Sequence, residues 1–207
     1  MNRRGIFAVA GLCLGIAGVA QAAVVFEQLP DYGNAYFSDA GGNYPFQAIA
    51  DNFGLSSNTA IGSVGVWGVY YPNNILADNF TVKIYADAFG APGTLLYSGA
   101  PTSTNSVDTG VDAFGVDVYE TTMTLAAPFN AAASTQYWLS VVNSTGLGSD
   151  WGWVTATADS AGAYTLDSGG SWSALGTSSS MRLYEVPAPS SLALLGLGGL
   201  IAGRRRR

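Results

Sequence analysis

The sequence predicts an all-β protein: an antiparallel β-sandwich of the jelly-roll type, flanked by an N-terminal signal helix and a short C-terminal hydrophobic helix. Two observations predict the sandwich. Between residues 23 and 185 no stretch has the apolar period of a helix, whereas short runs rich in Val, Ile, Tyr, Phe, Trp and Thr recur. Clusters of Gly, Asn, Asp and Pro separate these runs, and glycine occupies 27 of the 207 positions. About ten strands at this spacing favour a sandwich, with a small closed barrel as the alternative.

Three segments carry the strand pattern most clearly. Residues 80–85 alternate apolar with mostly polar side chains, and residues 137–142 and 181–185 are also rich in β-formers. The other expected strands are residues 24–28, 46–53, 61–71, 95–98, 114–125, 152–155 and 163–166. Turn-forming residues at 87–93 are expected to join two strands, and those at 167–170 to close a hairpin onto residues 171–173.

Residues 1–22 have the layout of a secretory signal peptide. Arg3 and Arg4 precede a short apolar stretch, and Ala20-Gln21-Ala22 supplies a small-residue cleavage site, so we expect cleavage after Ala22. A retained membrane anchor is the alternative reading. The single cysteine, Cys13, lies in this segment, and the mature chain would therefore lack disulfides, thiolate metal sites and a cysteine nucleophile.

Residues 186–207 form a second unusual segment after the body, residues 23–185. Val186-Pro187-Ala188-Pro189 is followed by an apolar run at residues 192–203, which is shorter than the roughly 20 residues that a membrane-spanning helix needs. The chain then closes with four arginines, which favour the cytoplasmic side of a membrane. The arrangement predicts a temporary stop during export, with a plain C-terminal anchor as the alternative. The four arginines are Arg204, Arg205, Arg206 and Arg207.

This tail resembles the PEP-CTERM sorting signal. The resemblance rests on Val186, Pro187 and Pro189, the short apolar run, and the arginines at 204–207, although Ala188 stands where the family usually has Glu. It implies secretion to the surface of a Gram-negative bacterium by way of the inner membrane. It also implies transient membrane association through the tail, and processing by an exosortase. Residues 50–53, 66–70, 79–87 and 90–93 of the body are similar to an uncharacterised β-sandwich module that precedes such tails.

The charge and the missing residue types restrict the chemistry of the body. Residues 23–185 hold all 14 acidic residues but only Lys83 and Arg182 as basic ones, a net charge of −12 against −6 for the whole chain. This field repels nucleic acid. The absence of histidine excludes Ser-His-Asp catalysis and histidine-ligated zinc. No catalytic residue and no cofactor are expected, so we predict that the protein is not an enzyme.

Paired carboxylates are the one catalytic arrangement that the composition leaves open. Asp108, Asp112, Asp117 and Glu120 lie close together in the sequence, and two facing carboxylates are sufficient for glycoside hydrolysis. The same residues equally suit a solvated acidic surface. A carboxylate-based glycosidase is therefore the less favoured alternative.

Aromatic side chains offer two interpretations. Trp151 and Trp153 lie on one side of an expected strand beside Asp150, so these three residues are the candidate exposed sugar-binding platform. The competing interpretation, that both rings fill the sandwich core, is favoured because exposed apolar patches are scarce on soluble domains. Trp67 and Trp138 are expected to lie in the core.

The sequence Ala-Asp-Asn-Phe occurs twice, at residues 50–53 and 77–80. We favour a local role in which Asp and Asn bond the backbone at a strand boundary while Phe enters the core. The alternative is that Asp51 or Asp78 supplies oxygen to Ca²⁺, but no calcium-binding loop motif is present. Metal binding therefore stays undecided at this point.

These observations together predict an exported, non-catalytic protein of the cell surface or extracellular matrix. Its expected partners are the export machinery, an exosortase-type processing enzyme and extracellular polysaccharide, but not nucleic acid. A dedicated carbohydrate-binding module is the main alternative function.

Overall fold

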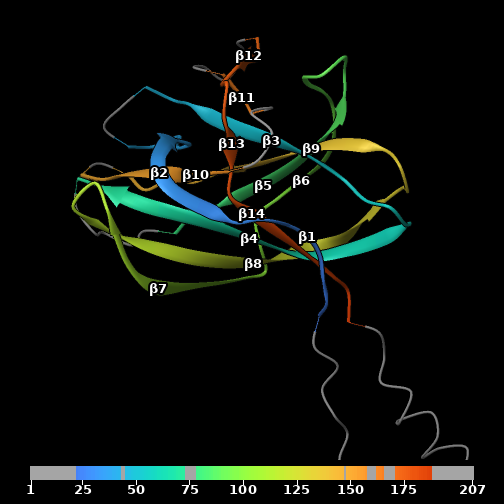
Figure 1. Ribbon diagram of the computed structural model, residues 1–207, viewed down its shortest axis with the longest axis horizontal. Coiled ribbons are helices and arrows are strands. Elements are labelled where there is room, and N and C mark those ends of the chain that lie inside the picture. The colour runs from blue at the N-terminus through green and yellow to red at the C-terminus, as the bar shows by residue number, and fades with distance from the viewer. Residues whose placement is uncertain are drawn as a thin grey trace, which may run out of the picture. The chain divides into compact units, whose positions relative to one another are not determined.

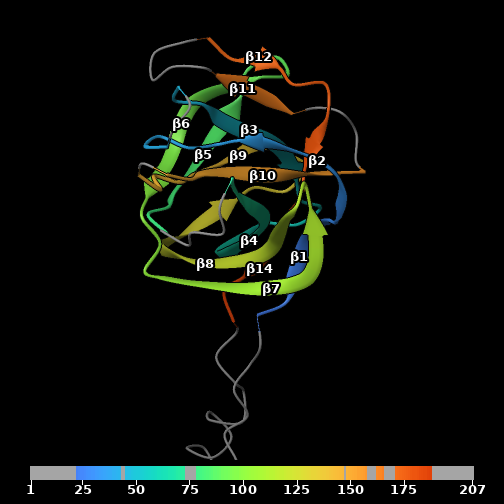
Figure 2. The ribbon, with the colours of Figure 1, turned by 90° about the vertical axis from the view of Figure 1, so that its left-hand side faces the viewer.

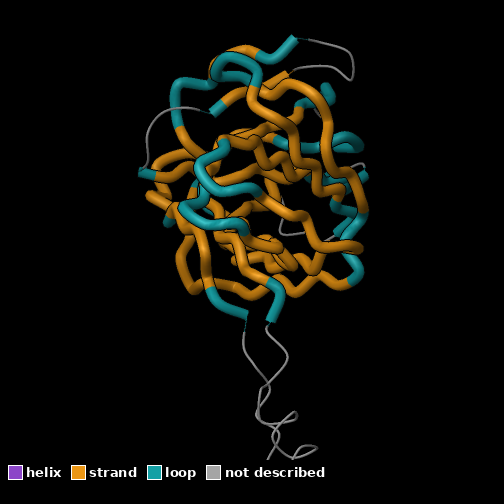
Figure 3. The backbone as a smooth tube through the Cα atoms, turned by 90° about the vertical axis from the view of Figure 1, so that its right-hand side faces the viewer, coloured by secondary structure: helices purple, strands orange, loops and turns teal. Residues whose placement is uncertain are grey.

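The computed structural model describes residues 22–42, 45–72, 78–146, 148–157, 162–165 and 171–187. Residues 22–186 form one compact unit, in which every named element is a strand (Figure 3). The all-β, antiparallel prediction is therefore confirmed for this part of the chain. The expected signal helix, the hydrophobic helix of the tail, Pro189 and the four arginines lie outside the described residues. No helix within the described residues is long and apolar enough to cross a membrane.

The larger of two sheets is built around one long strand (Figure 1). Strand β4 pairs with β8 along one edge, while β14 and β10 share its other edge, one after the other. Beyond these, β1 pairs with β14, β2 and β13 pair with β10, and β7 pairs with β8. The strands of this sheet are β1 (Val24–Gln28), β2 (Pro30–Phe37), β4 (Thr59–Tyr71), β7 (Ser103–Ala113), β8 (Val116–Ala131), β10 (Asp150–Ala156), β13 (Ser178–Ser179) and β14 (Met181–Glu185).

The smaller sheet has six strands in the order β12-β11-β3-β9-β5-β6, all antiparallel where paired. It lies over the larger sheet, as the side view shows (Figure 2). No named strand of one sheet pairs with a named strand of the other, and the isolated bridges of Asp39 with Gln47 and Asn143 lie outside the named strands. Its strands are β3 (Ala48–Gly54), β5 (Thr81–Asp87), β6 (Pro92–Gly99), β9 (Gln136–Val142), β11 (Ala163–Thr165) and β12 (Ser173–Ala174).

The core lies between the two sheets, because alternate residues of each strand point inward. Val64 and Val66 of β4 face the core from the larger sheet, and Val82 and Ile84 of β5 face it from the smaller one. All four are fully buried. Burial of each such side chain contributes about 1.5–3 kcal/mol, which makes this shared layer the main source of stability.

The local pattern located most strands but missed the polar ones. Strands β1 and β14 have the expected bounds, and the expected turn between β5 and β6 is present, closed by a hydrogen bond from Ala88 N to Ala91 O of 2.8 Å. Strand β7 was missed because its eleven residues are mostly Ser, Thr, Asn, Asp and Gly, and it lies at a sheet edge where apolar residues are not required. Strand β2 was missed because it begins with Pro30 and contains Gly33.

Candidate functional site

The residues expected to form an exposed sugar platform are buried. Asp150 is 1% exposed, and Trp151 and Trp153 are 0% exposed. The two indole rings lie in the core with centroids 6.2 Å apart, and Trp153 donates from Nε1 to the Ser180 carbonyl at 2.6 Å. The platform prediction is therefore wrong, and the competing core interpretation is confirmed. The reason is the position of β10, which lies inside the larger sheet with β4 and β2 on its two edges.

Trp67 and Trp138 are buried as expected, but on the outer faces of the two sheets. Trp67 packs with Val69 and Val118 beneath the Arg182 guanidinium, which lies 5.0 Å from the ring centroid. Trp138 packs against Ala50 and donates from its indole nitrogen to the carboxylate of Asp87 at 2.9 Å. The sequence predicts Trp67 and Trp138 in the main core, but each belongs to a smaller, separate cluster on the outer face of its sheet.

The Arg182 guanidinium lies over the Trp67 ring of this outer cluster. It forms ion pairs with Glu27 on β1 at 2.5 Å and with Glu120 on β8 at 2.6 Å. Gly65 of β4 lies opposite Arg182 of β14. Because Gly65 has no side chain, it does not obstruct the Arg182 side chain where that side chain crosses β4. Arg182, one of the two basic residues of the body, thus links its own strand β14 to β1 and β8.

The clustered carboxylates lie along one hairpin rather than across a cleft. Asp112 and Asp117 face each other in register on β7 and β8, and Asp108 accepts from the Gly110 amide at 2.8 Å. Tyr119 donates to Asp117 at 3.2 Å, and partial burial, followed by the bond and charge of Asp117, raises the pKa of Tyr119. Glu120 is engaged by Arg182. Asp108, Asp117 and Glu120 thus have partners within the protein, and none of the four faces another carboxylate across a cleft.

The two aspartates considered for calcium are engaged by protein donors. Asp51 is fully buried and accepts from the amides of Asn52 at 2.8 Å and Ser179 at 2.5 Å. Asp78 accepts from the Tyr70 hydroxyl and from Ser106. Among the described residues, no group of three or more His, Cys, Asp or Glu side chains is positioned to hold a metal ion.

The phenylalanines of the two Ala-Asp-Asn-Phe segments behave as predicted. Phe53 and Phe80 are both 2% exposed and lie in the core, where Phe80 makes an edge contact with Trp151. Of the two aspartates, Asp51 accepts from the adjacent Asn52 amide but lies within β3, and Asp78 bonds the side chains of Tyr70 and Ser106. The core position of the phenylalanines is therefore confirmed, whereas bonding to the local backbone at a strand boundary is not found for Asp78 among the described residues.

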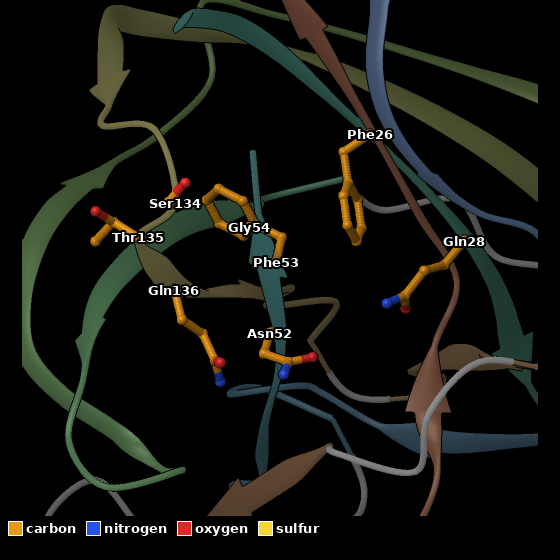
Figure 4. Close-up of a pocket in the computed structure, with 8 residues that line it drawn as sticks. All are labelled: Phe26, Gln28, Asn52, Phe53, Gly54, Ser134, Thr135 and Gln136. Atoms are coloured by element: carbon orange, nitrogen blue, oxygen red, sulfur yellow. The ribbon is translucent and has the colours of Figure 1, made fainter. Parts of the chain in front are cut away.

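A polar pocket lies where β1 of the larger sheet faces β3 and the start of β9 in the smaller one (Figure 4). We call it the edge pocket. Its volume is about 360 Å³, and amides, hydroxyls and two phenyl rings line it. None of its described lining residues carries a charge. They are Phe26, Gln28, Asn52, Phe53, Gly54, Ser134, Thr135 and Gln136.

Hydrogen bonds on two sides of the edge pocket hold it in shape. In the amide orientation that satisfies both ends of Gln28, its Nε2 donates to the Ser179 carbonyl at 2.9 Å and to Asp51 at 3.2 Å. This contact ties β1 of one sheet to β3 of the other. On the opposite side, Ser134 N donates to the Leu55 carbonyl at 2.8 Å, and Ala133 N donates to the side chain of Asn58 at 2.8 Å.

Two further hollows have different linings. A groove of about 300 Å³ on the outer face of the larger sheet is mainly apolar, and it includes the exposed rings of Tyr71 and Phe114. A third pocket of about 430 Å³ lies at the start of β4 and the end of β8, with Asn58 and Asn130 among its residues. Among the described residues lining these three pockets, none is Asp or Glu.

Sequence reasoning missed the edge pocket because its residues come from three distant segments, and the Ala-Asp-Asn-Phe repeat that includes Asn52 and Phe53 gives no sign of the other two. One sequence signal did mark exposed aromatics: Asp-Ala-Phe-Gly occurs at residues 87–90 and again at residues 112–115. In both copies the chain turns at Phe-Gly with positive φ, at Phe89 and at Phe114. Both rings are exposed.

The tail motif begins where the compact unit ends. Glu185 N donates to the Ala23 carbonyl at 3.0 Å, and Val186 N donates to the Ala60 carbonyl at 2.8 Å. The chain therefore enters the unit through β1 and leaves it through the adjacent strand β14. Val186 is the last residue of that unit.

Comparison with known proteins gives two matches. Residues 24–191 match a domain of unknown function (DUF7901), and residues 185–207 match the PEP-CTERM protein-sorting motif. No curated protein and no solved structure matches the chain.

Proposed function

Because the chain belongs to the DUF7901 domain family and ends in a PEP-CTERM protein-sorting motif, we propose that it is a non-catalytic cell-surface or matrix protein that associates with exopolysaccharide. The sorting motif implies export and processing by exosortase-type machinery. The observation that carries the proposal is this motif on a β-body that lacks histidine and, once the signal peptide is removed, lacks cysteine. Export across the inner membrane of a Gram-negative cell, with brief membrane association of the tail, belongs to the same proposal.

The arrangement of the carboxylates supports a non-catalytic role. Glycoside hydrolysis needs two carboxyl groups on opposite sides of a bound sugar. Asp112 and Asp117 instead lie side by side on one hairpin, and Glu120 is ion-paired with Arg182. The described linings of the three pockets supply amides, hydroxyls and apolar groups.

Cell fractionation tests the sorting step. A chain lacking residues 190–207 is expected to lose surface retention and accumulate in another fraction, because it lacks the apolar run and the arginines. A matched control replaces the four arginines by lysine, which keeps the positive charge and is expected to behave like the unaltered protein. Unchanged surface retention of the truncated chain would defeat the proposal.

A carbohydrate-binding module is the second candidate function, and the edge pocket favours it. Its mixture of amides, hydroxyls and phenyl rings suits a polyhydroxylated ligand. Under this proposal the protein associates with polysaccharide by direct binding. The same body then serves both functions, since surface retention and sugar binding are compatible.

The jelly-roll topology is part of the proposal for the body. Successive strands β2, β3, β4 and β5 alternate between the two sheets, as do β8, β9 and β10. The resulting sheet orders are β2-β10-β4-β8 and β3-β9-β5-β6. These orders support a rolled pair of Greek keys, to which β1, β7 and β11–β14 are additions.

A further inference from the structure

We infer that the edge pocket is a binding site for a neutral saccharide segment. The inference rests on the proposed function, and it moves the sugar site from the buried tryptophans of β10 to residues of β1, β3 and the start of β9.

The polar groups of the pocket match the hydrogen-bonding pattern of sugar hydroxyls. Each hydroxyl of a sugar both donates and accepts, and so do the amide of Asn52, the amide of Gln136 and the hydroxyl of Ser134. The Asn52 and Gln28 side chains point into the same space from the two sheets (Figure 4). A carboxylate- or phosphate-bearing ligand would require a cationic partner, and none lines the pocket.

The charge of the whole body strengthens the preference for a neutral ligand. Residues 23–185 carry a net charge of −12, and the negative field opposes the approach of uronic acids or phosphorylated sugars. Both basic residues of the body lie elsewhere: Arg182 is paired with two glutamates, and Lys83 lies on β5. Neutral hexose units face no such repulsion.

Two phenyl rings supply the apolar side of the pocket. Phe53 is 2% exposed and forms the floor, while Phe26 is only partly buried and leaves part of its ring open. The ring centroids are 6.2 Å apart with an interplanar angle of 60°. Phe26 therefore supplies most of the accessible apolar surface, and such a surface suits the C–H face of a sugar ring.

Preorganisation lowers the entropic cost of binding. Gln28 has its amide nitrogen committed to Ser179 and Asp51, so its orientation is set before a ligand arrives. The chain before β9 is held by hydrogen bonds from Ala132 N to the Tyr137 hydroxyl at 3.1 Å and from Ser134 N to Leu55 at 2.8 Å. Rigid groups that need no ordering on binding improve affinity.

The volume indicates a short segment of a longer polymer rather than a large ligand. A pocket of about 360 Å³ lies near the lower end of the range for small-molecule sites, roughly 300–1,000 Å³. The site therefore covers only a small part of a polysaccharide chain. Weak binding per site is the expected consequence.

An oligosaccharide array tests the inference on the exported protein. The probes are neutral glucan, mannan and galactan oligosaccharides together with uronic acid oligosaccharides. The unaltered protein is expected to bind at least one neutral probe and to prefer it over the acidic ones. The variant N52A/Q136A loses two hydrogen-bonding amides and is expected to bind that probe about tenfold more weakly or not at all.

A control variant tests whether loss of binding is specific to the edge pocket or follows from removing any surface amide. Asn130 is an exposed asparagine of β8 in the third pocket, and Asn130→Ala is expected to leave binding unchanged. If N52A/Q136A is unstable by thermal melting, Asn52→Asp places a charge at the same position with little change in shape, and it is also expected to weaken binding. Equal binding by folded pocket variants and the unaltered protein would overturn the inference, as would binding of acidic probes alone.

Failure of this inference is distinguishable from failure of the proposed function. A chain that is exported and processed but binds no neutral probe refutes the edge-pocket site and leaves the surface role in place. A chain that stays in the cytoplasm refutes the surface role whatever the array shows. Fractionation of N52A/Q136A is expected to match that of the unaltered protein, because neither substitution alters the sequence of the sorting motif.

Discussion

At the scale of single residues, close packing against the core tryptophans leaves little freedom for substitution. Trp151 lies against Gly68 on the neighbouring strand β4, and an added Cβ at Gly68 would lie 2.2 Å from its indole nitrogen. This nitrogen is buried and has no hydrogen-bond partner among the described residues. The close approach of ring and backbone therefore explains why glycine occupies this position.

Gly68→Ala is expected to destabilise the protein by about 1–3 kcal/mol, because a large buried ring must shift to admit the methyl group. Chemical denaturation measures the change. Gly54→Ala is the control, since its Cβ would have only one neighbour, at 3.6 Å. If Gly68→Ala lowers the free energy of unfolding no more than Gly54→Ala does, the explanation by close packing against Trp151 is wrong.

The buried Tyr70 makes the free energy of unfolding depend on pH in the alkaline range. Burial, followed by the hydrogen bond to Asp78, raises the pKa of its hydroxyl above the ordinary value near 10. The folded state keeps this proton at a pH where the unfolded chain loses it. The contribution of Tyr70 to the free energy of unfolding is therefore fully present below pH 10. It declines above pH 10, by at most about 1.4 kcal/mol per pH unit.

Tyr70→Phe is expected to reduce this decline between pH 10 and pH 11.5, measured as the slope of unfolding free energy against pH. The variant also loses the bond to Asp78, so its stability at pH 8 is expected to be lower. Tyr71→Phe, at an exposed position on the same strand, is expected to keep the original slope. An unchanged slope for Tyr70→Phe would show that other groups control the alkaline transition.

At the scale of elements, two hairpin turns contain a residue that is unfavourable for the turn. Phe89 and Phe114 have φ of 58°, followed by Gly90 at 83° and Gly115 at 78°. Two-residue turns with positive φ at both positions prefer Asn-Gly, and a bulky residue in the left-handed region is strained. The glycines satisfy this requirement, but the phenylalanines do not.

Phe89→Asn is expected to stabilise the protein by roughly 1 kcal/mol, because asparagine tolerates the left-handed conformation and the fully exposed ring contributes no burial. Thermal unfolding measures the gain. Phe89→Ala removes the ring but retains the strain, and it is expected to give little change. A destabilised Phe89→Asn protein would mean that the ring makes contacts that outweigh the strain.

At the scale of the whole molecule, one core joins the two sheets. Met123 and Leu183 of the larger sheet and Ile49 and Leu139 of the smaller one belong to the same buried cluster. The Gln28–Asp51 contact adds a polar link across the same interface. Neither sheet can therefore expose its inner face without disrupting the other.

The body is consequently expected to unfold in a single cooperative transition. Tryptophan fluorescence and far-ultraviolet circular dichroism are expected to give coincident denaturation curves, since Trp67 and Trp138 report on the outer clusters and Trp151 and Trp153 on the core. Two separated transitions would indicate that an outer cluster or an edge hairpin unfolds independently.

The sequence alone determined the features that depend on neighbouring residues. The β-rich runs located β1, β5, β9 and β14, the turn residues at 87–93 located a hairpin, and the C-terminal segment carried the sorting motif. These features are local, because a strand or a turn depends on side chains a few positions apart. Polar edge strands such as β7 carry no comparable signal.

The tertiary structure alone decided which aromatic residues face the core and where a pocket forms. Trp151 and Trp153 belong to a strand that others enclose, whereas Trp67 and Trp138 pack on outer faces. The edge pocket combines residues from β1, β3 and the start of β9. Their proximity follows from strand order and register, which arise from contacts between residues distant in the chain.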